Sequence, residues 1–258
     1  MGHTELGYMP HSARWRVVAT LLAAPRLDVP AVAGATTKAA EGRLRELRSD
    51  PSLAYCFWLL VRLAEAARGP DFVEDAARLG IEVSADDAAL TVIARVTDRT
   101  RVELNQFPES GPFGEIASLA LRRALTETVG TEARSLFGSS LEDLERAFRR
   151  YSSPAQFATL ARRFFGDFYG RTLRYYVERE LQNRIGEEGL PTIADANAFA
   201  EALDLHARAT SRVVERFAAD WYDKHHWEAG GAISREEAQG FVAHGLTKLR
   251  AGLLADTR

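Results

Sequence analysis

The densest group of side chains that can bind a metal lies near the C-terminus, between Asp220 and Glu228. Within it Asp223 and His226 are three residues apart, so they would lie on one face of a helix. A carboxylate and an imidazole at this spacing form one half of a di-iron site in helical bundles. The pair therefore supports one hypothesis, a metal-dependent helical enzyme that uses residues 220–228.

The number of available ligands argues against an occupied metal site. Apart from His226, no histidine follows an acidic residue at this spacing, so the second half of a di-iron site is missing. A zinc site needs three or four ligands, which only the fold could gather. The simpler interpretation is an amphipathic helix end with Trp221 and Trp227 anchored in the core. We expect no metal and no other cofactor.

Residues 144–184 form the most basic part of the chain. They contain nine arginines and four acidic residues, a local net charge of +5 in a chain whose net charge is −3. Aromatic side chains lie between the arginines, and such a mixture can stack on the bases and bind the phosphates of a single-stranded nucleic acid. This alternative assigns nucleic-acid binding to Arg146, Arg149, Arg150, Arg162, Arg163, Arg171 and Arg174.

The spacing of the charges in this segment favours a structural role instead. Basic and acidic residues alternate four apart, which allows ion pairs within one helix. They do so in Arg163–Asp167–Arg171, Arg174–Glu178 and Glu180–Arg184. Aromatic residues cover two neighbouring faces of the same helix, including Phe164 and Phe168. We therefore expect a long central helix near residues 154–185, with Gly166 and Gly170 allowing a neighbour to approach closely.

Start signals along the chain predict further helices around this one. Trp15, Val18 and Leu22 recur at helical spacing. Asp50 with Pro51 is an N-cap followed by proline in the first turn, and the sequence after Pro70 and Asp71 predicts a short helix closed by Gly80. Capping boxes are predicted at Ser84–Asp87, Ser140–Asp143, Ser153–Gln156 and Ser234–Glu237.

Breaks between these helices are predicted where glycine and proline gather, at 108–114, at 186–191 and at Gly230 with Gly231. A long helical stretch begins near Thr192. Alternating β-branched runs are absent apart from a short extended piece at 81–83, and no solenoid repeat occurs. The predicted fold is all-α, an irregular multi-helix bundle with little or no β structure. It forms a single domain over residues 1–258, with a possible subdomain boundary near 108–114.

Composition places the protein in a reducing, aqueous compartment. Its single cysteine, Cys56, lies in an apolar run and cannot form an internal disulfide. That run, from Leu53 to Val61, is less than half of the roughly 20 residues that cross a bilayer. Residues 1–16 contain charges and no apolar stretch of the kind found in signal peptides. We expect a soluble, cytoplasmic protein without membrane association.

Two short segments near the N-terminus resemble a helix-turn-helix, with 29–35 as the supporting helix and 36–47 as the recognition helix. The turn glycine of such a motif is misplaced, since Gly34 falls within or at the end of the first helix, and Thr36 is a good N-cap. A helical hairpin with no role in DNA binding is the more common outcome for such a pattern.

Catalytic motifs are absent, including the phosphate-binding glycine loops, the nucleophile elbow and His-Glu-x-x-His. Cys56 lies among aromatic residues, which would raise the pKa of a buried thiol. The favoured interpretation is a helical interaction or assembly subunit that is not an enzyme and acts through protein-protein contacts. Its partner would be another protein or a second copy of the chain.

Overall fold

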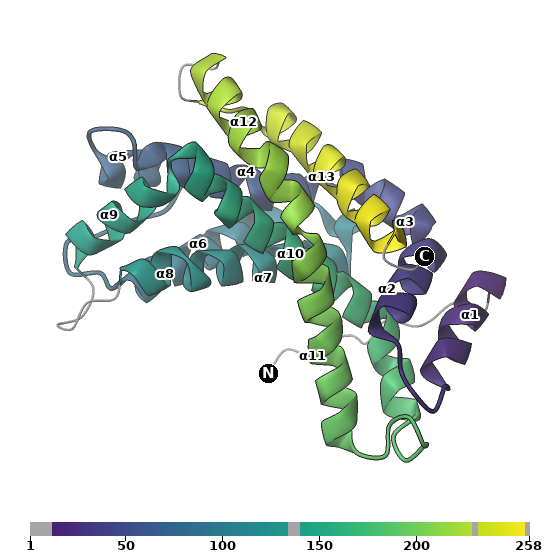
Figure 1. Ribbon diagram of the computed structural model, residues 1–258. Coiled ribbons are helices and arrows are strands. Elements are labelled where there is room, and N and C mark those ends of the chain that lie inside the picture. Colours follow the sequence, from purple (N-terminus) through teal and green to yellow (C-terminus); the bar gives the residue numbers. More distant parts are fainter. Residues whose placement is uncertain (1–11, 134–139, 229–231, 256–258) are drawn as a thin grey trace.

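The structure is a computed structural model that describes residues 12–133, 140–228 and 232–255. Within these ranges it consists of helices and connecting turns, which confirms the predicted all-α fold (Figure 1). The one β feature of the described residues is an isolated antiparallel bridge between Glu187 and Leu190. The extended piece predicted at 81–83 does not form a strand.

The first half of the chain forms helices α1 to α8 and two short 3₁₀ turns. They are α1 (Ala13–Leu22), α2 (Val29–Ala39), α3 (Glu41–Glu46), η1 (Leu47–Ser49), α4 (Pro51–Ala66), α5 (Phe72–Arg78), α6 (Ala89–Leu104), η2 (Pro108–Ser110), α7 (Pro112–Glu127) and α8 (Val129–Glu132). The break predicted at 108–114 is the turn between α6 and α7, two helices that pack against each other. A subdomain boundary at this turn stays a prediction.

The second half forms the longer helices. They are α9 (Leu141–Tyr151), α10 (Pro154–Asn183), α11 (Ile193–Thr210), α12 (Arg212–Glu228) and α13 (Arg235–Ala255). The predicted long helix is α10, with 30 residues. It runs through the middle of the molecule and packs against α7, α11 and α12 (Figure 1).

Most of the predicted helix starts are confirmed by their capping contacts. The Asp50 carboxylate accepts a hydrogen bond from the Leu53 backbone N–H at 2.9 Å, with Pro51 in the first turn. Asp71 caps α5 in the same way. Complete capping boxes form at Ser140–Asp143 and at Ser234–Glu237. Local side-chain chemistry therefore sets where these helices begin.

Two predicted capping boxes are wrong in detail. Ser153 precedes α10 but makes no side-chain cap, because its hydroxyl donates to the Arg150 carbonyl at 3.1 Å. The Ser84 N–H does donate to Asp87 at 2.7 Å. That contact closes a turn, however, and α6 begins only at Ala89. Asp87 also binds the guanidinium of Arg95, which holds it outside the helix.

The stretch that begins near Thr192 is not one helix. Its start at Thr192 is a capping box with Asp195, but the helix ends at Thr210, and α12 begins at Arg212. The Ser211 hydroxyl donates to the Arg208 carbonyl at 2.7 Å. A serine hydroxyl that bonds back to the preceding turn competes with the regular helix pattern. The helical stretch is therefore divided into α11 and α12 at this serine.

The helix-turn-helix hypothesis is wrong. Helix α2 continues from Val29 to Ala39, so the turn expected before Thr36 does not exist. Thr36 lies inside this helix and is fully buried, rather than capping a second one. The remaining piece, α3, has only six residues. No recognition helix therefore extends over residues 36–47.

The core is built around the aromatic side chains of α10 and α4. Phe164 and Phe168 are both fully buried, as the two apolar faces predict. Phe57 of α4 contacts the rings of Phe164 and Phe165 and stacks on Phe241 of α13 at 4.8 Å between ring centroids. Burial of large aromatic side chains is a main source of folding energy, so α10 is the central element of the fold.

The two glycines of α10 set its distance from α11. A Cβ atom placed on Gly166 would lie 3.1 Å from the Cα atom of Arg208. One placed on Gly170 would lie 3.3 Å from the Cα atom of Asp204. Both distances are shorter than ordinary carbon contacts. The predicted close approach is therefore confirmed, and α11 is the neighbour.

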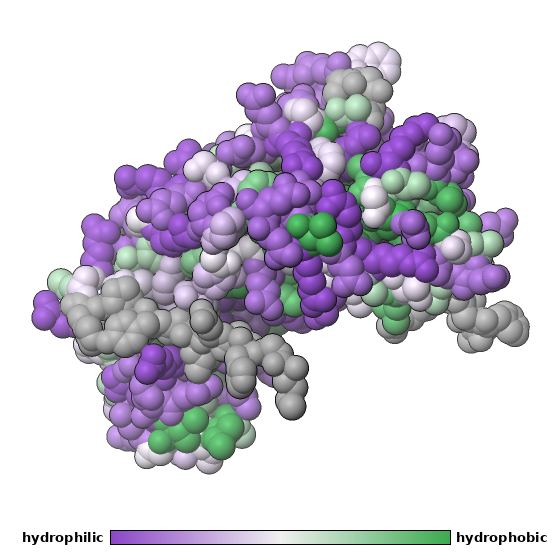
Figure 2. Space-filling view, turned by 180° about the vertical axis from the view of Figure 1, so that it is seen from behind, coloured by the Kyte–Doolittle hydropathy of each residue, from purple (hydrophilic) through white to green (hydrophobic). Residues whose placement is uncertain are grey.

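The face of the molecule seen in Figure 2 is mainly polar. Hydrophilic residues cover most of the face seen in Figure 2, and apolar residues form separate patches outside the grey atoms. No helix in the described ranges combines the length and the apolar character needed to cross a membrane.

Candidate functional site

The seven arginines assigned to nucleic-acid binding all have partners within the protein. They bind acceptors at 2.5–3.4 Å: Arg146 with Asp143, Arg149 with the Ala67 carbonyl, Arg150 with Glu132, Arg162 with Glu215, Arg163 with Glu127, Arg171 with Asp167, and Arg174 with Asp204 and Glu178. Six of these seven guanidinium groups face carboxylates, which reduces the positive charge available to phosphates. The basic segment is therefore largely neutralised by acidic residues of other helices and of its own.

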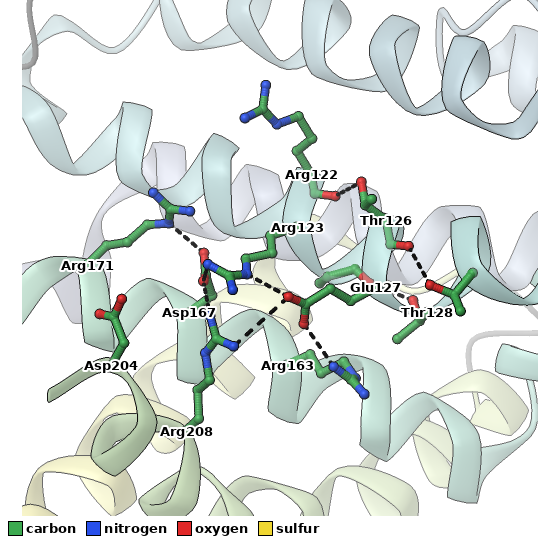
Figure 3. Close-up of polar contacts among 12 residues, drawn as sticks. Arg122, Arg123, Thr126, Glu127, Thr128, Arg163, Asp167, Arg171, Asp204 and Arg208 are labelled. Atoms are coloured by element: carbon green, nitrogen blue, oxygen red, sulfur yellow. Dashed lines mark hydrogen bonds and ion pairs between the residues drawn. The ribbon is translucent and has the colours of Figure 1, made fainter. Parts of the chain in front are cut away.

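The tightest part of this network lies where α7, α10 and α11 meet (Figure 3). Asp167 of α10 is only 5% exposed and contacts three arginines, Arg171 at 2.5 Å, Arg208 at 3.1 Å and Arg123 at 3.3 Å. Figure 3 shows that the guanidinium groups approach it from different helices. Cationic partners of this kind offset the loss of hydration of a buried carboxylate.

Glu127, at the end of α7, is the second carboxylate of the network. It pairs with Arg123 at 2.7 Å and with Arg163 at 2.8 Å (Figure 3). Burial acts to raise the pKa of Glu127, but the hydrogen bond from Arg123 and the nearby charges of Arg208 and Arg163 outweigh it. The pKa of Glu127 therefore lies below its ordinary value, and the side chain is charged near neutral pH.

The cavity beside these groups is too small for a typical substrate. It has a volume of about 90 Å³ and is lined by Arg123, Glu127, Arg163, Asp167 and Arg208, among others. Sites for small molecules usually enclose roughly 300–1,000 Å³. The network joins three helices and satisfies its own charges, so we interpret it as structural.

The proposed metal ligands Asp223 and His226 both lie on α12, near its C-terminal end. His226 Nδ1 lies 3.3 Å from Glu65 Oε1 of α4, whereas Asp223 is exposed on α12. Within the described ranges, no three His, Cys, Asp or Glu side chains come close enough together to hold a metal ion. The expectation that Trp227 is anchored in the core is wrong, because its side chain is 87% exposed. Trp221 does pack against the core, where it contacts Phe241.

Glu65 is a buried polar residue that the sequence did not single out. It is 5% exposed, pairs with Arg62 at 2.8 Å and accepts a hydrogen bond from the Ile233 backbone N–H at 3.2 Å. Because His226 also contacts it, Glu65 holds the end of α12 and the start of α13 against α4. These partners are up to 168 residues apart, a distance at which no local sequence pattern gives a signal.

Cys56 is a core thiol, as predicted. Its side chain is fully buried, and burial raises the pKa of the thiol far above its ordinary value. A thiol that stays protonated and has no access to solvent is a poor nucleophile.

A groove lies between α1, α2 and α13. Its volume is about 680 Å³, within the range of binding sites. Its lining includes small and aliphatic residues, which are Ala13, Val17, Ala31, Gly34, Ala35 and Leu254. Val17 is 53% exposed, so the groove leaves apolar surface in contact with water.

Charged side chains surround this apolar lining. Arg14, Lys38 and Arg250 contribute positive charge, and Glu41 contributes the one acidic group of the lining. The groove residues come from both ends of the described chain, with α1 and α2 at the start and α13 at the end. The groove gives no signal in the sequence, because each helix alone shows only an ordinary mixture of small, apolar and basic residues.

The comparisons with known proteins give no further assignment. The sequence matches no family model, and no curated protein or solved structure matches the chain.

Proposed function

We propose that the protein is a helical interaction or assembly subunit, and that a helix of a partner protein docks in the groove between α1, α2 and α13. The observation that carries this proposal is the groove itself, which combines about 680 Å³ of space, an apolar lining and a positively charged rim. Exposed apolar surface bordered by polar residues is typical of protein interaction sites.

The small residues of the groove favour a helix as the docking element. Ala31, Gly34, Ala35 and Lys38 follow one another at helical spacing along a single face of α2. A face of alanine and glycine lets a second helix approach closely, and an apolar stripe fills such a groove at every third or fourth position. The protein would then act by presenting this surface, without catalysis.

No contact among the described residues specifically favours either alternative function. The arginines proposed for nucleic-acid binding are engaged by acceptors within the protein. Of the groups proposed for metal binding, His226 contacts Glu65 and Asp223 is exposed. The interaction function is therefore the one that we propose.

Co-purification from the native host tests this function. Val17→Glu places a charge in the groove at a position that is already 53% exposed, so the fold should tolerate it. Leu90→Glu on α6 is the matched control, since Leu90 is 51% exposed and lies outside the groove. We expect a stoichiometric protein partner, which can be a second copy of the chain, to be retained by wild type and the control and lost with Val17→Glu. Equal retention by all three would contradict the assignment of the groove.

A further inference from the structure

The rim of the groove carries more positive charge than the protein itself neutralises. The Glu41 carboxylate is shared by Arg250 at 2.8 Å, Arg14 at 3.1 Å and Arg45 at 3.7 Å. Lys38 is exposed, and its ammonium group has no carboxylate partner in the described part of the chain. The groove lining thus holds three cations, Arg14, Lys38 and Arg250, and one carboxylate, Glu41. A partner helix that fits this surface must carry acidic groups next to its apolar residues.

The outer face of α11 has this chemistry. Ala194, Ala198, Glu201 and Leu205 are spaced four, three and four residues apart, so they form one stripe on the helix, and the first, second and fourth are apolar. All four are exposed, and Leu205 is 64% exposed. Ile193, at the start of the helix, is 66% exposed. An aliphatic stripe of this kind, facing water, is typical of a docking helix.

The charge of this region is opposite to that of the groove. Residues 185–207 contain five acidic residues and no lysine or arginine. Glu201 lies within the stripe and has no cationic partner among the described side chains. The groove offers an unpaired ammonium group at Lys38, and α11 offers an unpaired carboxylate at Glu201.

We propose that the partner helix is α11 of a second copy of this chain, docked in the groove with Glu201 facing Lys38. This inference rests on the proposed function of the groove and specifies its occupant. The small residues of the stripe match the small residues of α2, which allows the two helices to approach closely. Leu205 would cover apolar groove surface near Val17 or Leu254.

Two-fold symmetry would allow this contact to form a closed dimer. Within one chain α11 and α2 pack against each other, so the helix that carries the acidic stripe is a neighbour of a helix that lines the groove. In a two-fold dimer each copy can place α11 in the groove of the other, which forms the contact twice. A single pairing without exchange would instead continue into longer assemblies.

Charge reversal on each side of the contact tests the proposal. Sedimentation equilibrium over a range of concentrations should show that the purified wild-type protein self-associates. Lys38→Glu and Glu201→Lys should each weaken the association constant by about tenfold or more, since each replaces an attraction by a repulsion. The chain that carries both substitutions should regain affinity, because the reversed charges attract again. Lys248→Glu, an exposed position of α13 outside the groove, should associate as wild type does.

Several results would overturn the proposal. A wild-type protein that stays monomeric up to about 100 μM would exclude a stable contact between copies. If the chain is monomeric but still loses a different protein partner through Val17→Glu, the groove function stands and α11 is not its occupant. Self-association that is unaffected by either reversal, or not recovered in the double variant, would place the interface elsewhere.

Discussion

The pKa of the Asp204 carboxyl group lies above its ordinary value. Burial raises the pKa of Asp204, and the charge and hydrogen bond of Arg174 oppose this only in part. One of its oxygens, Oδ1, is buried without a hydrogen-bond donor. The residue lies over Gly170, one of the two glycines at which α10 and α11 approach closely. Its charged form is therefore accommodated at a cost to the fold.

The pH dependence of stability tests this cost. A raised pKa means that the folded protein binds the proton more tightly than the unfolded chain, so ionisation of Asp204 at rising pH destabilises the fold. We expect Asp204→Asn to melt at or above the wild-type temperature near pH 7, with an advantage that shrinks as the pH falls to about 4. Asp98→Asn, at a side chain that is 71% exposed, serves as the control. A variant that melts well below wild type by the same margin at both pH values would contradict the prediction.

A substitution at Phe168 tests whether the aromatic side chains of α10 form the core. Its ring is fully buried in α10, so Phe168→Ala removes a large apolar side chain and leaves a cavity. We expect the free energy of unfolding to fall by roughly 3–5 kcal/mol. Trp227→Ala removes an aromatic ring that is 87% exposed and should change the free energy of unfolding by less than about 0.5 kcal/mol. Urea unfolding of both variants measures the difference, and equal effects would show that Phe168 is not a core residue.

At the scale of helices, sequence patterns predicted what is local and missed what depends on neighbours. The caps at Asp50, Ser140 and Ser234 were predictable because each involves residues three positions apart. The predicted cap at Ser153 fails because its hydroxyl bonds back to the Arg150 carbonyl of the preceding turn. A serine can bond forward or backward, and the surrounding packing decides which.

A pair of glycine substitutions tests how α10 and α11 are spaced. Gly166→Ala should destabilise the protein by about 1–3 kcal/mol, because the added Cβ would lie 2.8 Å from Ser211 Oγ and 3.1 Å from Arg208 Cα. Gly240→Ala on α13 meets nothing within 4 Å and should stabilise the helix by up to about 1 kcal/mol. Thermal melting of both variants gives the sign of each effect. Stabilisation by both substitutions would mean that α11 does not constrain Gly166.

Across the whole molecule, ion pairs within a helix were predictable from the sequence, whereas ion pairs between helices were not. The pairs Arg171–Asp167, Arg174–Glu178 and Glu180–Arg184 were predicted from their spacing along α10. Arg163 was expected to pair with Asp167 but instead binds Glu127, and Arg208 takes its place.

The pairings between helices account for why a basic segment of sequence does not become a basic surface. Arg162–Glu215 and Arg150–Glu132 join residues that are far apart in the chain, so no spacing rule predicts them. The groove was missed for the same reason, because its walls meet only in the folded molecule. The class of fold was predictable from the sequence. The interaction hypothesis was also formed from it, but the surface through which the protein would act was not predictable.

Photo-cross-linking in the native host tests the docking groove most directly. A photoreactive amino acid replaces Val17 inside the groove, and in a separate chain it replaces Leu90, which is equally exposed but lies outside the groove. We expect a discrete protein cross-link from position 17, which is lost when Lys38→Glu is added, and no such product from position 90. Equal products from both positions, or a product from position 17 that persists with Lys38→Glu, would contradict the assignment of the groove as the docking site.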